Sequence, residues 1–476
     1  MNFRRWVVFT FLIHVLIVVV DKGGGLILYL LTANQPDQHG KSGIAASLPF
    51  ILGALANLGF ATALVYFVRR GRYSAQVCFE TSMAVALVWG SLVAVVSALF
   101  TLYLLPCIDP KWTFDPIIVL PICAAVPLIL VASYANSTQL ATEHIKDYGF
   151  VHLFTALSFL PAFFGCFFLL GGSVARQHVP LAVAWGRLAS AFCVALLAVW
   201  LVRKIVTLRL RVHRDFLVDG VRYGWKANLT STLSYLNHRL DLVVLGAVLF
   251  AHFQAQGADK TDAERLAATQ VAFYSMSVTW AELVWHFPEA MRDLFFSKVA
   301  GSSTQEARYM TPVLSRLGLA LSLIGALLIV WLVDPLMGGI TSIAKGSDAV
   351  WHTDWSPTVG ASLLMLVPGT VAYTVSKVLQ ADLAARNHLQ TCVNAQLLAL
   401  VVMLGLDLLW IPEQGAVGAA AASTVAYVSS TIFTLWAYGR QTGTPIWRCL
   451  FVHTSDFRYI REIAAAVVGK LRRKRA

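Results

Sequence analysis

The sequence predicts an all-α polytopic membrane protein with about 12 transmembrane helices in two pseudo-symmetric six-helix lobes. Three observations predict this fold class: the composition, the spacing of long apolar runs, and a repetition of features between the two halves. Of the 476 residues, 58% are hydrophobic and 13% are charged, whereas about 25% are charged in an average soluble protein. The mean hydropathy of +0.68 agrees with a chain that lies largely in lipid.

Long apolar runs recur along the whole chain. A helix crosses the roughly 30 Å hydrocarbon core with about 20 apolar residues. We therefore expect spans at Trp6–Leu31, Ile44–Val68, Cys78–Leu104, Phe114–Leu140, Val151–Leu170, Val179–Val202, Gly224–Phe250, Ala268–Met291, Pro312–Val333, Thr358–Leu383, Gln390–Ile411 and Gly415–Gly439. The loops between them are short and contain no GxxxxGK[ST] phosphate-binding motif. We expect neither an enzyme active site nor a cofactor.

The two halves of the chain follow one plan. The predicted domains are an N-terminal lobe (1–202), a basic cytoplasmic connector (203–223), a C-terminal lobe (224–440) and a basic cytoplasmic tail (441–476). The stretch VVVDKGGGLILYLL in the first span matches YLNHRLDLVVLG in the seventh, with Asp21 and Asp241 at equivalent places. Because each half has an even number of spans, the two copies run the same way through the membrane, as in parallel repeats.

The basic residues indicate the orientation of the chain. Most of the 37 Lys and Arg residues fall in segments on the side of the N-terminus, and the chain ends in a basic tail. This bias predicts that both termini are cytoplasmic, and that the tail lies on anionic membrane lipids. The net charge of +12 is therefore interpreted as a topology signal, with no nucleic acid as partner. The seven cysteines are scattered without the spacing of metal ligands.

Polar residues inside the spans predict a cavity. At 100° per residue, Arg239 and Asp241 fall on nearly opposite faces of span 7, so they are not simple partners of each other. Span 8 carries one continuous polar stripe, consisting of Thr279, Glu282, His286, Glu289 and Asp293. Charged groups inside a membrane span are costly and usually face a bundle interior.

Four cations of the spans are candidates for binding an anionic substrate such as a phosphate: Lys22, Arg187, Arg239 and Lys377. The glycine run around Gly24 is a candidate hinge of the first span. Plainer interpretations stay open: Arg239 pairs with a carboxylate of span 8 only to orient two helices, and Lys377 only reaches the membrane surface. Asp334 and Asp407 lie near span ends, where we expect them to be solvated.

Two pairs of stretches resemble a known family. YGWKANLTSTLSYLNHRLDLVVLG with VAFYSMSVTWAELVWHFPEAMRDLFFSKVAG is similar to spans 7 and 8 of O-antigen flippases, and LLMLVPGTVAYTVSKVLQADLAARNH with LLWIPEQGAVGAAAASTVAYV is similar to their spans 10 to 12. These flippases belong to the polysaccharide transporter branch of the multidrug/oligosaccharidyl-lipid/polysaccharide exporter (MOP) superfamily. The resemblance is strongest from Gly224 to Tyr438 and weaker in the first half.

The resemblance implies a flippase of the bacterial inner membrane that moves undecaprenyl-pyrophosphate-linked oligosaccharide by alternating access, for surface polysaccharide such as O-antigen or exopolysaccharide. Arg239 and Asp241 match the R-L-D of the family and Glu282 the acidic residue of its A-E-L. Membrane lipids and other polysaccharide assembly proteins are the further partners it implies. In this interpretation Asp21, Asp241, Glu282 and Gly24 serve coupling or gating, and substrate phosphate competes with a carboxylate for a cation.

Three alternatives stay open at the level of sequence. The first is a cation-coupled multidrug exporter of the same superfamily, which prefers an acidic and aromatic cavity. The second is a membrane-embedded polysaccharide polymerase, ligase or glycosyltransferase, although these enzymes usually need a larger external loop than this chain has. The third is a scaffold within a polysaccharide assembly complex.

Overall fold

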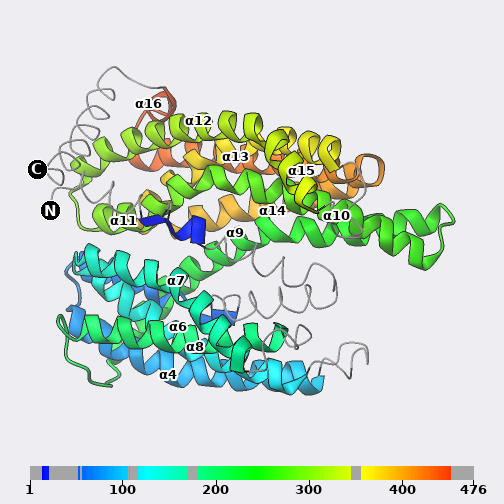
Figure 1. Ribbon diagram of the computed structural model, residues 1–476. Helices are drawn as coiled ribbons and strands as arrows, with labels where there is room; N and C mark the ends of the chain where they lie inside the picture. Colours follow the sequence, from blue (N-terminus) through cyan, green and yellow to red (C-terminus); the bar gives the residue numbers. More distant parts are fainter. Residues whose placement is uncertain are drawn as a thin grey trace, which may run out of the picture. The chain divides into compact units, whose positions relative to one another are not determined.

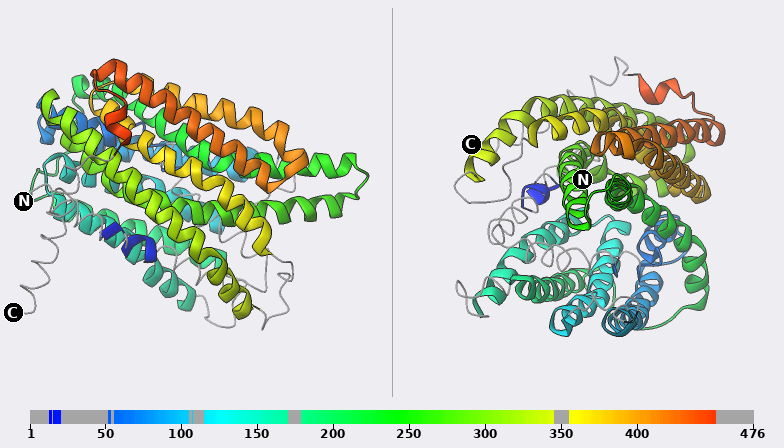
Figure 2. Two further views of the ribbon diagram at one scale, coloured as in Figure 1. Left: turned by 90° about the horizontal axis from the view of Figure 1, so that it is seen from above. Right: turned by 90° about the vertical axis from the view of Figure 1, so that its right-hand side faces the viewer.

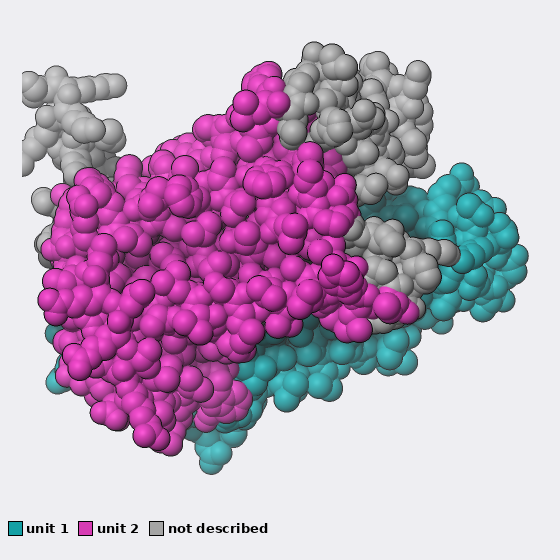
Figure 3. All heavy atoms as spheres, turned by 90° about the horizontal axis from the view of Figure 1, so that it is seen from below, with its two compact units in different colours: residues 1–11, 229–476 teal, residues 12–228 magenta. Residues whose placement is uncertain are grey.

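The computed structural model describes residues 13–14, 16–20, 52–53, 56–104, 107, 115–169, 179–344 and 355–451 (Figure 1). Within these ranges the regular structure is helical and contains no strand. The predicted fold class, an all-α polytopic membrane protein built as two lobes, is confirmed. The chain divides into two compact units, one formed by 12–228 and the other by 1–11 with 229–476 (Figure 3).

The unit 12–228 is built from helices that follow one another along the chain. Its helices are α3 (Phe60–Arg69), α4 (Ala75–Leu99) continued by the π-helix η1 (Phe100–Leu104), α6 (Pro116–Ala141), α7 (Ile145–Leu169), α8 (Val179–Val202) and the first part of α9 (Arg214–Ala255). Helix α6 packs against α4 and α8, and α8 also packs against α7. The core of this unit is aromatic and apolar, with Phe159, Phe163 and Phe167 along α7.

The unit 229–476 contains the rest of α9 and the helices that follow it. These are α10 (Lys260–Glu282), the 3₁₀ turn η4 (Leu283–Trp285), α11 (His286–Ala300), α12 (Thr304–Ala344), α13 (Trp355–Ala385), α14 (Leu389–Gln414), α15 (Ala416–Thr442) and α16 (Trp447–Leu450). Helix α15 packs against α13 and α14. Gly369 lets α13 approach α15 closely, because a Cβ atom there would lie 2.6 Å from the Cα atom of Thr424.

Nine helices of the described ranges are long and apolar enough to cross a membrane, against twelve predicted spans. Most of the first two predicted spans lies outside the described residues. The predicted eighth span is not among the nine because α10, although 23 residues long, is not apolar enough. It is not one helix, because α10 ends at Glu282 and a 3₁₀ turn separates it from α11. The continuous polar stripe predicted from Thr279 to Asp293 is therefore broken at this turn.

Two segments predicted to lie between spans contain helix, the connector in its second half and the segment 251–267 over most of its length. Helix α9 begins at Arg214 and ends at Ala255, so it extends beyond the predicted span at both ends. The predicted loop 251–267 contains the end of α9, a short turn, and the first part of α10, which starts at Lys260. Gly257 has a φ of +89° in this turn, and Asp259 caps α10 through Thr261. The hairpin extends past α13 and α15 of the same unit (Figures 1 and 2).

Candidate functional site

An ion pair joins α9 to the end of α10. Nη2 of Arg239 lies 3.0 Å from Oε1 and 3.2 Å from Oε2 of Glu282. The Arg239 side chain is 41% exposed and the Glu282 side chain 16%. The arginine is thus the more exposed member of the pair. This pairing is the one that the plainer interpretation of Arg239 expects.

Four rings form a cluster one turn beyond Glu282, which we call the aromatic cluster: His238, Trp285, Tyr373 and Tyr427. The His238 and Trp285 ring centroids are 4.4 Å apart, and Tyr373 stacks on Tyr427 at 5.0 Å. The indole Nε1 of Trp285 donates to the carbonyl oxygen of Thr370 at 3.0 Å, which fixes its orientation. The three larger rings are at most 4% exposed, so this cluster is a wall of the site and its surface is not open to a ligand.

Lys377 reaches the same turn from α13. Its Nζ lies 4.2 Å from the ring centroid of Trp285 and 5.7 Å from that of Tyr373, the geometry of a cation–π contact. Residues three apart in a 3₁₀ turn stand one above the other, so Glu282 and Trp285 share a side. Two predicted cations thus contact one short segment: Arg239 pairs with Glu282 at the end of α10, and Lys377 lies over Trp285 in the turn that follows.

A network of amides lies beneath the aromatic cluster. Nδ2 of Asn237 donates to the carbonyl oxygen and to Oε1 of Gln396, at 2.9 and 3.0 Å. Nε2 of Gln396 donates to Tyr373 OH at 2.7 Å and to Oε1 of Gln380 at 2.8 Å. Asn237 is 1% and Gln396 2% exposed. Buried polar groups that bond to one another in this way hold their helices in one register, here α9, α13 and α14, while Oδ1 of Asn237 has no partner among the described residues.

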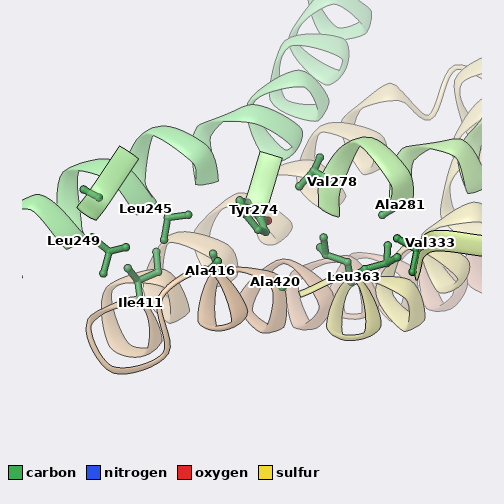
Figure 4. Close-up of a cluster of buried hydrophobic side chains, with 13 residues drawn as sticks. Leu245, Leu249, Tyr274, Val278, Ala281, Val333, Leu363, Ile411, Ala416 and Ala420 are labelled. Carbon is green, nitrogen blue, oxygen red and sulfur yellow. The ribbon is translucent and has the colours of Figure 1, made fainter. Parts of the chain in front are cut away.

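Asp241 lies on the opposite side of α9 from Arg239, as predicted. One carboxylate oxygen, Oδ2, accepts a hydrogen bond from Tyr274 and another from Ser423 at 3.1 Å. Its other oxygen, Oδ1, accepts from the backbone N–H of Leu242 at 2.8 Å. The residue is 1% exposed. Figure 4 shows its partner Tyr274 within an apolar cluster with Leu245 and Ala420.

Asp407 is the clearest correction to the sequence analysis. We expected it to be solvated near a span end, but it is 0% exposed on α14. Neither of its carboxylate oxygens has a hydrogen-bond partner among the described residues. Small residues of α15, namely Ala419, Ser423 and Ala426, let α15 pack closely against α14. The side chain of Asp334 lies outside the described residues.

The remaining predicted site residues lie elsewhere. Arg187 belongs to the other compact unit, with its guanidinium carbon 3.6 Å from the ring centroid of Phe159. Asp21, Lys22 and Gly24 lie outside the described residues. In the part of the chain that the structure describes, no three His, Cys, Asp or Glu side chains come together as a metal site would require.

Sequence reasoning missed Trp285, Gln396 and Tyr427 as parts of the site. A signal for Gln396 and Asp407 was present, since they are eleven residues apart, about three turns, and therefore share a face of one span. Trp285 carries no such signal, because its place depends on the 3₁₀ turn.

Comparison with known proteins gives a match to part of the sequence and a match to the whole fold. A family described as polysaccharide biosynthesis protein matches residues 34–253. This range lies mainly in the first half of the chain, whereas we judged the resemblance to be strongest in the second half. No curated protein sequence matches the chain significantly.

Solved structures of MATE transporters match nearly the whole chain. An outward-facing multidrug resistance MATE transporter of the MOP superfamily has 14% sequence identity and a TM-score of 0.66, with 93% of this chain and 96% of that chain covered. A MATE in complex with MaL6 has 11% identity and a TM-score of 0.69, with 93% and 97% covered.

A MOP superfamily transporter from Pyrococcus furiosus also matches, with 11% identity, a TM-score of 0.67, and 93% of this chain and 96% of that chain covered. The reverse polarity of its binding pocket suggests a different function for that protein. Across these matches the structural likeness is high and the sequence identity low. The chain thus has the two-lobed fold of the MATE transporters.

Proposed function

We propose that the protein is a flippase that moves a polyprenyl-pyrophosphate-linked oligosaccharide across the bacterial inner membrane for surface polysaccharide synthesis. The observation that carries this proposal is that Arg239 and Lys377 both contact the segment 282–285 at the end of α10. The partial match to a family of polysaccharide biosynthesis proteins and the transporter fold support it.

The two cations suit a pyrophosphate group. Hydrogen bonds between a guanidinium or ammonium and phosphate oxygens are roughly twice as strong as neutral ones. Arg239 presents several N–H donors in a plane, and 41% of its side chain is exposed. Lys377 is held as a point charge above Trp285. The sugar–pyrophosphate head binds here in the proposal, while the polyprenyl tail stays in lipid.

In this proposal, the carboxylate of Glu282 competes with the substrate pyrophosphate for Arg239. When no substrate is present, the carboxylate neutralises Arg239 across 3.0 Å. A pyrophosphate that binds Arg239 displaces it and leaves Glu282 without that partner. Substrate binding therefore changes the connection between α9 and α10, which is the gating role that we assign to Glu282.

The aromatic cluster positions these groups. Its buried rings leave no face for a sugar, and they set the place of Lys377 through Trp285. The amide network fixes Tyr373 and therefore the cluster. Substitutions in this network should alter binding through Lys377 and not through direct contact with the substrate.

The first test uses cells that lack the gene. Single lipid-linked repeat units should accumulate and surface glycan should be lost. Restoring wild type should reverse both effects, whereas Arg239→Ala at normal abundance should not. Arg239→Lys should restore display only in part, since lysine lacks the planar donor set.

Arg265→Ala is the matched control, because Arg265 is an exposed arginine of the α9–α10 hairpin, with 78% of its side chain accessible. Cells with this variant should display normal glycan. Normal glycan in cells with Arg239→Ala, or an absence of lipid-linked intermediates in the deletion strain, would contradict the flippase assignment.

A multidrug exporter is the second candidate, favoured by the fold shared with a multidrug resistance MATE transporter. The carboxylate of Glu282 and the nearby rings would serve a cationic drug, but the two cations disfavour it. In the relative from Pyrococcus furiosus, pocket polarity is the feature that suggests a different function. Drug susceptibility of the deletion strain decides: hypersensitivity to cationic drugs with unchanged surface glycan would establish this alternative.

A further inference from the structure

The connector that follows α8 is fastened to the start of α4 at two points. At the first, Oε1 of Gln76 accepts a hydrogen bond from the backbone N–H of Thr207, and its Nε2 donates to the carbonyl oxygen of the same residue, both at 2.8 Å. At the second, Nε2 of His213 lies 2.8 Å from Oε2 of Glu80, and the backbone N–H of His213 donates to Oγ1 of Thr81 at 3.1 Å. Both fastenings lie within one compact unit.

The chain between these fastenings is longer than the distance that it has to span. Gln76 and Thr81 are five residues apart on α4, which is about 7 Å along a helix with a rise of 1.5 Å per residue. The six steps from Thr207 to His213 can reach about 20 Å. The segment 208–212 is therefore free to bow away from α4, and each of its residues is exposed. We call this segment the arch.

The arch combines apolar and basic side chains. Leu208, Leu210 and Val212 are 53%, 65% and 56% exposed, and Arg209 and Arg211 alternate with them along the chain. Neighbouring apolar side chains that stay open to the surroundings mark an interaction surface. The described part of the chain leaves this surface uncovered, so its partner is another molecule.

The place of the arch selects a membrane surface as that partner. Helix α4 is one of the helices apolar and long enough to span a membrane, and Gln76 lies in its first turn. The arch is thus held at the end of a span, at the level of lipid headgroups. Trp200, near the end of α8 that leads into the connector, is 47% exposed, and Nζ of Lys204 lies 4.5 Å from its ring centroid. Tryptophan is enriched at the interface between membrane and water.

The charge of the connector matches anionic lipids. From Arg203 to Arg214 the chain has five basic residues and no acidic one. Basic segments next to a span are attracted to anionic headgroups, and a guanidinium binds phosphate oxygens through charge-assisted hydrogen bonds. An acidic protein would match the charge as well, but it would not account for three apolar side chains held at headgroup level, which an acyl layer covers.

The other unit repeats this arrangement after its last predicted span. Oγ of Ser315 on α12 donates to the carbonyl oxygen of Cys449 at 3.0 Å, and Nη1 of Arg316 donates to that of Arg448 at 2.7 Å. Trp447 is 57% exposed, with the guanidinium carbon of Arg448 5.4 Å from its ring centroid. In each half, the segment after the sixth predicted span is thus tied to the third and presents apolar and basic side chains. This repetition supports a common kind of partner for both segments.

We propose that the arch is a binding segment for anionic phospholipid. Arg209 and Arg211 bind headgroup phosphates, while the three apolar side chains insert at the boundary between headgroups and acyl chains. Because the connector follows α8, is tied to α4 and leads into α9, bound lipid holds these three helices at one level of the membrane. The proposal does not depend on which substrate the protein moves.

Amide hydrogen exchange of the full-length protein tests lipid binding. Phosphatidylglycerol added to nanodiscs of phosphatidylcholine should slow exchange in residues 208–212 several-fold. Arg209→Gln together with Arg211→Gln should remove this slowing, and the protein should fold normally because both side chains are exposed. Lys260→Gln together with Arg265→Gln is the matched control. It also removes two exposed positive charges, at the start of α10, and it should keep the slowing.

Spin labels at neighbouring positions test the depth of insertion. Leu210→Cys and Arg211→Cys each carry one label, in a protein whose cysteines outside the buried ones are replaced by serine, namely Cys107, Cys166 and Cys193. With phosphatidylglycerol present, oxygen, which concentrates in lipid, should relax the label at position 210 more strongly. A water-soluble nickel chelate should relax the label at position 211 more strongly.

Several results would overturn the proposal. Equal exchange of the arch in the two lipid mixtures, or equal slowing in the arginine double variant, would exclude a contact of these arginines with anionic lipid. Two labels that both face water would exclude insertion. Slowing that requires a cytosolic extract and not phosphatidylglycerol would assign the arch to a protein partner. Since none of these measurements uses glycan display, they stay decisive even if the flippase assignment fails.

Discussion

The two faces of α9 carry opposite charges, and these charges lie in different environments. On one face Arg239 is half-exposed and paired with Glu282. On the other, two residues along the chain, Asp241 is 1% exposed and accepts three hydrogen bonds. A charge in a membrane span predicts function only in general. The difference between the faces shows which charge can meet a ligand and which one organises the bundle.

The largest effect on stability is expected when the buried carboxylate of Asp241 is removed. Asp241→Ala takes the shared acceptor away from Tyr274 and Ser423, which are left with their mutual contact of 3.1 Å. We expect a loss of about 2–4 kcal/mol in the free energy of unfolding, because buried polar groups lose their partners. Asp241→Asn keeps an acceptor oxygen and should lose less. Thermal unfolding in detergent measures both, and equal stability of all three proteins would contradict the structural role.

The half-exposed face should behave in the opposite way. In a double-mutant cycle with Arg239→Ala and Glu282→Ala, we expect a coupling energy of about 1 kcal/mol or less, since solvent screens the exposed arginine. Glycan display should nevertheless fall sharply in Arg239→Ala. A coupling energy as large as the effect of Asp241→Ala would show that the pair mainly holds α9 against α10. The plainer interpretation of Arg239 would then be preferred.

The separation of these two faces was predictable, whereas the environment of Asp407 was not. Arg239 and Asp241 differ by 200° on a helix, which follows from their spacing alone. The burial of Asp407 depends on a neighbour, since Ala419, Ser423 and Ala426 of α15 bring that helix close. A sequence gives the distance of a residue from the end of its span, but not which helix covers it.

Helix ends outside the membrane were equally hard to predict. The apolar run of span 7 ends near Phe250, while α9 continues to Ala255 and begins already at Arg214. Polar helical residues beyond the lipid leave no trace in hydropathy. The break between Glu282 and His286 could not be predicted either, because a 3₁₀ turn has the same composition as the helix around it. The cluster of Trp285 with Lys377 depends on that turn.

The smallest expected effect concerns Asp259, an exposed carboxylate that serves as a reference for the buried ones. It caps α10, with hydrogen bonds from the hydroxyl and the backbone N–H of Thr261. The hydroxyl is the main cause that lowers the pKa of Asp259, and backbone N–H groups contribute. Because the folded-state pKa is lowered, the stabilisation is present at neutral pH and is lost as the pH falls through that pKa.

Asp259→Asn should therefore speed amide exchange at the start of α10 slightly at neutral pH, and the difference from wild type should vanish in acid. Exchange at residues 260–263, corrected for the intrinsic pH dependence, measures it. A difference of constant size at every pH would mean that the charge of Asp259 does not contribute and that only the shape of the cap matters. The expected pH dependence sets Asp259 apart from Asp241 and Asp407, which are 1% and 0% exposed.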